Sequence, residues 1–285
     1  MTKFRAAAVQ LRTGVDPASS VADAEKLIRQ AALSGAEYIQ TPEMTSVLDG
    51  NRKRLLASIE PQDTNASLIH LRALAAELGI HLHIGSMAIR LDNDSVANRA
   101  FVVGPDGGIL ASYDKIHMYD VDLGGGERYR ESKLYRPGAE AVVVDLPWTR
   151  LGLTVCYDVR FPQLFQSLAS AGATAIAIPA AFTQTTGEAH WHILLRARAI
   201  ETGCYVIAAA QGGHHEDGRE TFGHSLIVDP WGRVLAEAGR EPCVIFADID
   251  PELSRTTRQR IPALANQRAF APPVAADAPK LETAS

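Results

Sequence analysis

The 285-residue chain has few cysteines, no long hydrophobic run and no excess of positive charge. It carries 28 Lys and Arg against 33 Asp and Glu, a formal net charge of −5, so it lacks the positive field that attracts nucleic acid or anionic lipid. Its longest apolar stretch, residues 171–182, is about half a bilayer span. Residues 1–14 lack the apolar core of a signal peptide. We therefore expect a cytoplasmic protein that binds neither nucleic acid nor membranes.

The chain has only three cysteines, an odd number, which argues against a disulfide framework. So low a cysteine content is typical of a protein in a reducing compartment. Cys204 and Cys243 begin apolar segments, which favours core packing. Cys156 instead ends the apolar segment 151–155 and precedes a polar turn. A helix expected to begin near Phe161 would place its positive end close to this thiol and favour the thiolate. Position therefore indicates Cys156 as the candidate nucleophile.

Short apolar segments alternate with segments of helical periodicity along the chain, which predicts a mixed sheet covered by helices. The expected strands span residues 4–10, 36–40, 81–89, 98–103, 109–113, 141–145, 150–155, 173–179, 204–210, 223–228, 234–236 and 243–249. The expected helices span residues 20–34, 67–78, 161–171 and 189–202. We expect one layered α/β domain over residues 1–270. Residues 271–285, rich in Pro and Ala, predict a flexible tail.

Two further reactive side chains lie at the ends of predicted strands. Glu43 follows the strand at 36–40, and Lys115 follows the strand at 109–113. Either residue alone is a weak signal, because most Glu and Lys side chains face solvent. Together with Cys156 they are more informative, since the strand ends of one sheet converge on one crevice. A thiol that attacks a carbonyl or nitrile needs a base, which can be a histidine or a carboxylate, and a cation that stabilises the oxyanion.

Three motifs around these residues carry a family resemblance. Thr41-Pro42-Glu43, the segment 113–117 and the segment 155–162 resemble the Glu, Lys and Cys motifs of the nitrilase superfamily of carbon–nitrogen hydrolases, in the same order, with Glu43 and Lys115 72 residues apart. The resemblance covers residue 3 to about residue 270. Segments 182–191, 195–201 and 223–232 are similar to the nitrilase-like amidase branch. Phe182-Thr183 and Ala210-Gln211 resemble the deaminated glutathione amidases within that branch.

The resemblance implies a four-layer αββα sandwich that pairs as an αββα–αββα dimer, and it implies no metal or other cofactor. Glu43 is implied to be the general base that deprotonates Cys156. Lys115 and the backbone N–H of Tyr157 are implied to stabilise the oxyanion, and Cys156 is implied to form a thioester. A second carboxylate, Glu131, is implied to orient Lys115 and the incoming substrate.

Three residues are candidates for binding a small anionic amide. Arg160 lies just beyond the cysteine, where its guanidinium could bind a carboxylate through two hydrogen bonds. Its structural alternative is an ion pair with Asp158. Phe182 and Thr186 match the family's substrate pocket, where Phe182 could pack on the acyl chain and Thr186 could donate to a carboxylate or carbonyl. Gln211, at the end of the next strand, could also reach this pocket.

The expected activity is hydrolysis of a linear, non-peptide amide of an α-keto acid through a thioester acyl-enzyme, with deaminated glutathione, which gives 2-oxoglutarate and Cys-Gly, as the first choice. An ω-amidase acting on 2-oxoglutaramate, or another small-amide or nitrile hydrolase, is the alternative. A catalytically silent interaction scaffold is an alternative of another class. The partner expected besides the substrate is a second copy, in a homodimer or a higher homo-oligomer.

Two histidine pairs have the i, i+2 spacing that a zinc site could use, namely His81 with His83 and His190 with His192. On the predicted helix the second pair points to different sides, and no third ligand stands at a suitable spacing. We therefore expect no metal site.

Three other local features have structural interpretations. Gln163 stands where most relatives carry Glu, and we expect it to cap or pair within the helix start without affecting catalysis. The three glycines at 124–126 lack the Lys and Ser or Thr of a phosphate loop and predict a flexible active-site loop. Arg198 and Glu201, one helical turn apart, are expected to form a structural or dimer-facing ion pair.

Overall fold

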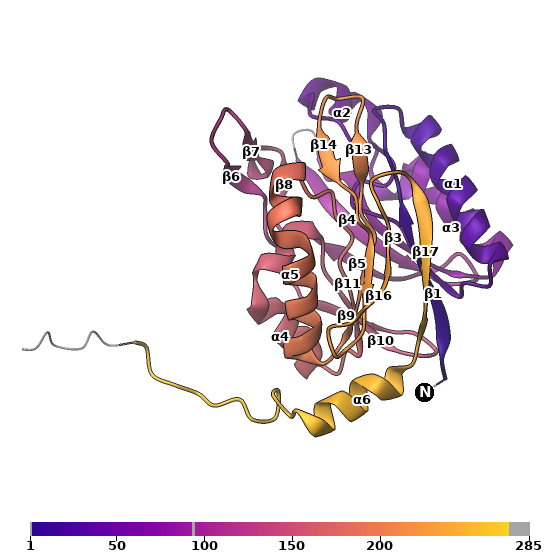
Figure 1. The fold of residues 1–285 in the computed structure, drawn as a ribbon. Helices are drawn as coiled ribbons and strands as arrows, with labels where there is room; N and C mark the ends of the chain where they lie inside the picture. The colour runs from indigo at the N-terminus through magenta and orange to yellow at the C-terminus, as the bar shows by residue number, and fades with distance from the viewer. Residues whose placement is uncertain (1, 93–94, 274–285) are drawn as a thin grey trace, which may run out of the picture.

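The computed structural model describes residues 2–92 and 95–273, which form four layers with two β-sheets at the centre. Figure 1 shows the sheets side by side, with helices on both outer sides. The first sheet is covered by α1 (Pro17–Leu33) and α3 (Ala66–Leu78), and the second by α4 (Pro162–Ser170) and α5 (Gln184–Thr202). The expected αββα sandwich is therefore confirmed.

The first sheet has parallel strands at its centre and antiparallel strands towards its edges. Strands β1, β2 and β3 run parallel, and α1 and α3 provide the crossovers that parallel strands require. Strand β8 (Tyr135–Arg136) pairs with β4 outside the main path. The spatial order is β17 (Cys243–Ile249), β1 (Phe4–Gln10), β2 (Tyr38–Gln40), β3 (His81–Arg90), β4 (Val96–Val103) and β5 (Ile109–Asp114).

The second sheet repeats this plan. Strands β10, β11 and β12 run parallel and are connected through α4 and α5, whereas β9, β15 and β16 pair antiparallel. The spatial order is β16 (Val234–Glu237), β15 (Leu226–Val228), β12 (Tyr205–Ala208), β11 (Ala175–Ala177), β10 (Arg150–Leu153) and β9 (Val142–Asp145).

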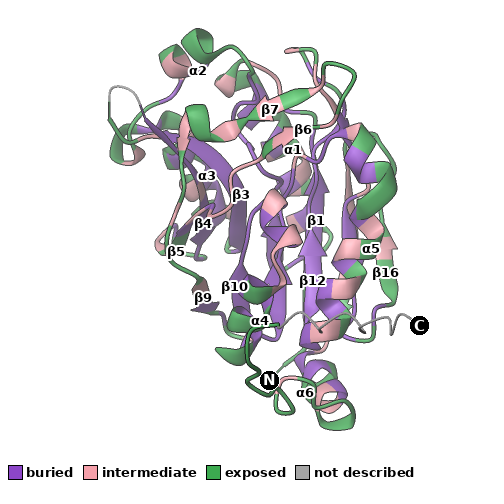
Figure 2. Ribbon diagram, turned by 90° about the vertical axis from the view of Figure 1, so that its left-hand side faces the viewer, coloured by how far each residue is buried: buried purple, intermediate pink, exposed green. Residues whose placement is uncertain are grey.

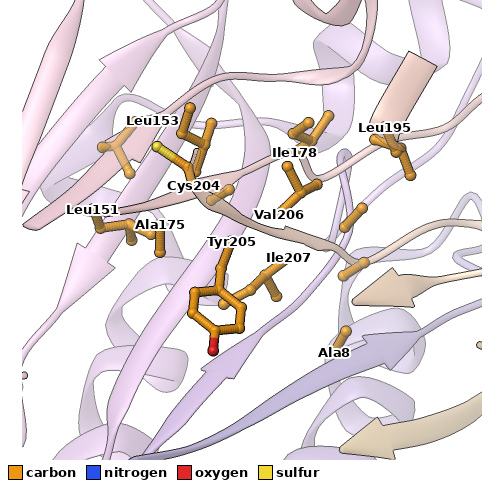
Figure 3. Packing of buried hydrophobic residues seen from close by; sticks show 14 of the residues in the cluster. Ala8, Leu151, Leu153, Ala175, Ile178, Leu195, Cys204, Tyr205, Val206 and Ile207 are labelled. Atoms are coloured by element: carbon orange, nitrogen blue, oxygen red, sulfur yellow. The ribbon is translucent and has the colours of Figure 1, made fainter. Parts of the chain in front are cut away.

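Alternating side chains of the central strands build two apolar layers around the second sheet. In β12, Tyr205 and Ile207 point toward Ala8 of β1, and Val206 points toward Leu195 of α5 (Figure 3). This alternation is the period of two that a strand imposes on its side chains. The central strands are buried and the outer helix faces are exposed (Figure 2). The apolar, nearly continuous strand segments of the sequence therefore reflect strands that are covered on both faces.

Several elements were not predicted from the sequence. They are α2 (Arg52–Ser58), α6 (Pro251–Arg260), the short strands β6 (Asp120–Asp122), β7 (Arg128–Arg130) and β8, the hairpin of β13 (Gly212–His214) and β14 (Glu220–Phe222), and three 3₁₀ turns at Gln62–Thr64, Glu131–Lys133 and Cys156–Arg160. Helix α5 begins at Gln184 instead of Ala189. Its first turn contains two threonines and a glycine, which are weak helix formers, so the periodicity misses it.

The glycines at 124–126 form the loop at the tip of a β-hairpin, and the flexibility predicted for this loop stays a prediction. The hairpin is made of β6 (Asp120–Asp122) and β7 (Arg128–Arg130), and all three glycines have positive φ angles. Residues 274–285, most of the predicted tail, lie outside the described residues, and the single domain over 1–270 stays a prediction. Within the described part of the chain, no helix has the length and apolar character needed to cross a membrane.

A close approach of two chain segments fixes the loop that follows β2. Gly85 lies in β3 at a register irregularity, and a Cβ there would come within 2.1 Å of the Thr41 carbonyl oxygen and 2.6 Å of the Pro42 carbonyl oxygen. The Gly85 N–H donates to Thr41 Oγ1 at 3.1 Å. Only glycine allows this contact. The loop 41–45 therefore lies directly on β3, which sets the position of Glu43.

Candidate active site

Glu43, Lys115 and Cys156 are brought together, and all three are buried. Glu43 follows β2, Lys115 follows β5, and Cys156 begins the 3₁₀ turn beyond β10. Lys115 Nζ lies 2.9 Å from Glu43 Oε1, and Cys156 lines the same cavity as both residues. The expectation that they share one sheet edge was wrong, because β2 and β5 belong to the first sheet and β10 to the second. The site lies where the two sheets meet.

The Glu43 carboxylate is surrounded by hydrogen-bond donors. Oε1 accepts from Lys115 Nζ and from Asn98 Nδ2, both at 2.9 Å, and Oε2 accepts from the Ala181 N–H at 2.9 Å. Burial raises the pKa of this carboxyl, but the Lys115 charge and the hydrogen bonds from Lys115, Cys156 and Asn98 outweigh burial and lower it overall. Glu43 is therefore ionised at neutral pH.

Lys115 is held between two carboxylates. Besides Glu43, it contacts Glu131, whose Oε1 and Oε2 lie 3.0 and 2.8 Å from Nζ. Glu131 Oε2 also accepts the Tyr119 N–H at 2.7 Å. Burial lowers the pKa of the ammonium, but the charges of Glu131 and Glu43 outweigh burial and raise it well above its ordinary value. Lys115 is therefore a fixed, fully charged cation.

Asn98 is a site residue that sequence analysis missed. Its Nδ2 donates to Glu43 Oε1 at 2.9 Å and to Glu131 Oε1 at 3.1 Å, and its carbonyl accepts the Lys115 N–H at 3.0 Å. The side chain is fully buried in β4. Asn98 thus connects both carboxylates to the cation between them. Its only signal in the sequence was a polar residue within an apolar strand.

Cys156 occupies a constrained turn. Its φ angle is 50°, in the left-handed region that a side chain disfavours, and its N–H donates to the Pro179 carbonyl at 2.8 Å. Burial and then the Glu43 charge raise the pKa of the thiol well above its ordinary value, and Lys115 opposes them. The thiol is therefore neutral, the state from which a base such as Glu43 removes its proton. The charge of Glu43 and the loss of water outweigh any effect of a nearby helix end.

The other two cysteines differ from each other. Cys204 is fully buried in the core, and its thiol donates to the Ala173 carbonyl at 3.2 Å, as core packing predicts. Cys243 begins β17 but is only partly buried, so the expectation of core packing was wrong for this residue.

A cavity of about 400 Å³ opens onto the Cys156 thiol. This volume suits a small ligand. The residues around it include the predicted site residues Glu43, Lys115, Glu131, Tyr157, Phe182 and Thr186, together with Tyr119, Tyr129 and Thr183, which were not predicted. Within the described residues, the Tyr157 N–H makes no hydrogen bond, so it is available next to the thiol.

Arg160 does not line this cavity. Its guanidinium lies 5.4 Å from the Phe182 ring centre and 5.8 Å from that of Tyr157, and its Nη2 is 3.3 Å from His190 Nδ1. The alternative ion pair with Asp158 was wrong. Asp158 is buried and accepts instead from Tyr113, His117 and the Val155 N–H.

Two glutamines also lie elsewhere than expected. Gln211 does not reach the pocket, because its Nε2 donates to Thr13 Oγ1 at 2.7 Å and to the Glu43 carbonyl at 2.9 Å, and its Oε1 accepts the Thr13 N–H at 3.0 Å. It holds the backbone of the Glu43 loop. Gln163 is exposed and provides no cap to α4, contrary to expectation.

The remaining polar pairs have structural partners. Arg198 Nη1 lies 2.7 Å from Glu201 Oε1, and its Nε donates to the Val159 carbonyl, so this ion pair is structural. His83 Nδ1 is 2.8 Å from the Tyr38 hydroxyl, and His192 Nε2 is 2.8 Å from Glu237. Across residues 2–92 and 95–273, no three His, Cys, Asp or Glu side chains gather as metal ligands would.

Comparison with known proteins agrees with this geometry. The sequence profile of the carbon–nitrogen hydrolases matches residues 5–259. Deaminated glutathione amidase of Yersinia enterocolitica is 39% identical over 271 residues, which are 94% of each chain. Human omega-amidase NIT2 is 37% identical over 94% of this chain and 96% of its own. The fold and the sequence together define an enzyme that hydrolyses carbon–nitrogen bonds in amides. The chain belongs to the carbon–nitrogen hydrolase family, within the nitrilase superfamily.

Solved structures are similar over the same extent. Nit3 of Saccharomyces cerevisiae, a member of branch 10 of the nitrilase superfamily, has a TM-score of 0.84 at 28% identity and covers 94% of this chain and 97% of its own. A mutant amidase from Nesterenkonia sp. AN1 has a TM-score of 0.80 at 26% identity, covering 93% of this chain and 94% of its own. That structure shows the acetamide moiety of fluoroacetamide covalently added to the active-site cysteine.

The raised pKa of Cys156 is testable by titration. The ultraviolet thiolate absorbance of the wild type minus that of Cys156→Ser should show no ionised Cys156 at about pH 8.5, where an ordinary cysteine is half ionised. Glu43→Gln, which keeps the side-chain shape but removes the negative charge, should move the ionisation to lower pH, because the Glu43 charge raises the thiol pKa. A difference signal that is already complete at neutral pH in the wild type would contradict this account.

Proposed function

We propose that this enzyme hydrolyses a linear amide of an α-keto acid, and that deaminated glutathione, cleaved to 2-oxoglutarate and Cys-Gly, is its principal substrate. The observation that carries the proposal is that Cys156, Glu43 and Lys115 are all buried and line one cavity of suitable size, with Lys115 bonded to Glu43. The name of the Yersinia relative supports the choice of substrate. We also propose a cytoplasmic location, where reducing conditions keep the Cys156 thiol free.

In the first half of the reaction, the Glu43 carboxylate accepts the Cys156 proton as Sγ bonds to the amide carbon. A neutral thiol with an ionised base beside it suits this step, since the base can accept the proton as the sulfur attacks. The carbonyl electrons move to oxygen, and the Lys115 ammonium and the Tyr157 N–H stabilise that oxyanion. When the carbonyl re-forms, the amine leaves with the proton from Glu43, and a thioester remains.

In the second half, Glu43 accepts a proton from water, whose oxygen attacks the thioester carbon. The same cation stabilises the second oxyanion. Its collapse releases the carboxylic acid, and the Cys156 sulfur recovers the proton from Glu43. Glu131 keeps Lys115 in place through two contacts, so the cation does not need to reorganise in either half. Fixed charges of this kind are most effective where water is excluded.

The substrate chain is proposed to lie along the wall opposite Lys115. Phe182 packs on its methylenes, and Thr186 donates a hydrogen bond to one of its oxygens. Both residues are buried and line the cavity. Arg160 lies outside the cavity, over the Phe182 ring, so its contribution is an attraction for an anionic substrate without direct contact.

The second candidate function is ω-amidase action on 2-oxoglutaramate. The match to human omega-amidase NIT2 over 94% of this chain supports it. Both reactions produce the same 2-oxoglutaryl thioester and differ in the leaving group, which is Cys-Gly in one and ammonia in the other. The part of the cavity that binds the acyl chain therefore does not discriminate between deaminated glutathione and 2-oxoglutaramate.

Replacement of the nucleophile tests whether this protein is an enzyme or a non-catalytic scaffold. Cys156→Ala should reduce ammonia release from small ω-amides by about 10³-fold or more, because no thioester can form. Cys204→Ala, which removes a buried thiol far from the cavity, is the control and should retain release. Undiminished release by Cys156→Ala would contradict the mechanism, and a wild type that releases nothing would favour the scaffold.

A side-by-side measurement of kcat/KM shows whether the enzyme prefers deaminated glutathione or 2-oxoglutaramate. The larger kcat/KM is expected for deaminated glutathione, since a larger leaving group can gain binding energy in a cavity of this size. A preference of more than about tenfold for 2-oxoglutaramate would reverse the order.

The enzyme is also proposed to act as a homodimer that pairs through α5. Ile193 and Ile200 lie two turns apart on one face of this helix and are 71% and 53% exposed. The turn at Gly232 packs on Ile200 and adds the exposed ring of Trp231 beside it. Exposed large apolar residues gathered on one face are typical of an interface. A twofold contact of α5 with its copy would extend the four layers to αββα–αββα.

Charged substitutions on this face test the dimer. Ile193→Glu combined with Ile200→Glu should convert a dimer to a monomer in analytical ultracentrifugation, because like charges would face each other across the axis. Leu33→Glu is the matched control, since Leu33 is 89% exposed on α1 in the other outer layer. A wild-type monomer, or a double variant that remains dimeric, would contradict the proposed interface.

A further inference from the structure

Tyr119 carries a buried hydroxyl that the proposed mechanism does not use. The residue lies just before β6 and lines the cavity with Cys156. Its hydroxyl oxygen is inaccessible to solvent and makes no hydrogen bond to any described residue. A buried hydroxyl without a partner costs free energy. An acceptor on a bound ligand would remove that cost.

The position of the Tyr119 ring is fixed. Its N–H donates to Glu131 Oε2 at 2.7 Å, which ties the residue to the carboxylate that holds Lys115. The ring meets Tyr157 at 5.1 Å with an interplanar angle of 70°, and Tyr129 at 5.1 Å with an angle of 42°. Aromatic contacts on both sides leave the ring little freedom. The hydroxyl is therefore held at a defined place in the wall of the cavity.

Two other hydroxyls lie beside it. Thr183 and Thr186 are buried at the start of α5 and line the cavity, and their Oγ1 atoms are 2.9 Å apart. Burial raises the pKa of the Tyr119 phenol, and the two threonine hydroxyls and Arg160 oppose that rise, so these groups are close to it. Tyr119 is therefore protonated at neutral pH and can donate. In the threonine pair one hydroxyl donates to the other, which leaves one proton for a ligand.

We propose that Tyr119, Thr183 and Thr186 form a subsite for the oxygen atoms at the far end of the substrate's acyl chain, with a carboxylate as its preferred ligand. Two free hydroxyl protons and the positive charge of Arg160 nearby match an anionic acceptor. The inference rests on the proposed function, and it deepens that function by assigning the acyl chain to this wall. Amides with an apolar chain would leave the hydroxyls unpaired and are disfavoured.

The subsite is tested by removing one oxygen atom. Tyr119→Phe should lower kcat/KM on 2-oxoglutaramate by about 10 to 100-fold, as expected for a hydrogen bond to a charged group. On pentanamide, which has the same chain length without the carboxylate and keto oxygens, the change should stay within about threefold. Thr186→Val should act in the same direction, and it serves as a second variant should Tyr119→Phe prove unstable.

Tyr129→Phe is the matched control, because it removes a hydroxyl that already bonds to Glu127 at 3.2 Å. It should leave the ratio of kcat/KM for the two amides unchanged. An equal loss on both amides by Tyr119→Phe would overturn the subsite, because the hydroxyl would then act on a part that the two amides share. Unchanged rates on both would overturn it as well.

Binding of the product separates this inference from the proposed function. In calorimetry, 2-oxoglutarate should bind Tyr119→Phe about 10-fold or more weakly than it binds the wild type, while pentanoate should show little difference. That result with a wild type inactive on every amide would retain the subsite and reject the proposed function. Equal binding of 2-oxoglutarate to both proteins, with amide hydrolysis intact, would reject the subsite alone.

Discussion

The buried Lys115 ammonium between Glu43 and Glu131 is the interaction on which the rest of the site depends. One cation and two carboxylates away from bulk water are stable only when each charge is paired and hydrogen-bonded. The protein supplies those bonds through Asn98, the Tyr119 N–H and the Ala181 N–H. The same arrangement contributes to the state of the thiol, because burial and then the charge of Glu43 raise the pKa of Cys156 and keep the sulfur protonated. Base and nucleophile are therefore paired before substrate arrives.

The two-sheet architecture explains how residues far apart in sequence reach this cation. The loop with Glu43 lies on β3 because Gly85 leaves room for it, and Gln211 from beyond β12 holds its backbone. The segment after β11 adds the Ala181 N–H from the second sheet. The Glu43 carboxylate is thus positioned from both sheets, through Oε1 by groups of the first sheet and through Oε2 by the Ala181 N–H of the second. The apolar layers between the sheets are part of the catalytic geometry, since any shift of one sheet against the other would change these distances.

Much of this arrangement could be predicted from the sequence, because strands that are covered on both faces produce short apolar runs. Polar residues at the ends of such runs, Glu43 and Lys115, were found in this way. Asn98 and Tyr119 were missed, since one lies inside a strand and the other in a segment without periodicity. The alternative pair of Arg160 with Asp158 was wrong because residue spacing does not give direction in a 3₁₀ turn. The ionisation of Cys156 depends on burial, which the sequence does not reveal.

The hydrogen bond between Tyr119 and Glu131 has a consequence for how such enzymes diversify. It joins the two ends of the β6–β7 hairpin directly beside Lys115. The hairpin tip at 124–126 can therefore gain or lose residues while its base stays closed, and surface loops tolerate such changes at little energetic cost. Two residues of this hairpin, Tyr129 and Arg130, line the cavity. Evolution can thus reshape the entrance for a new leaving group without altering the reacting atoms.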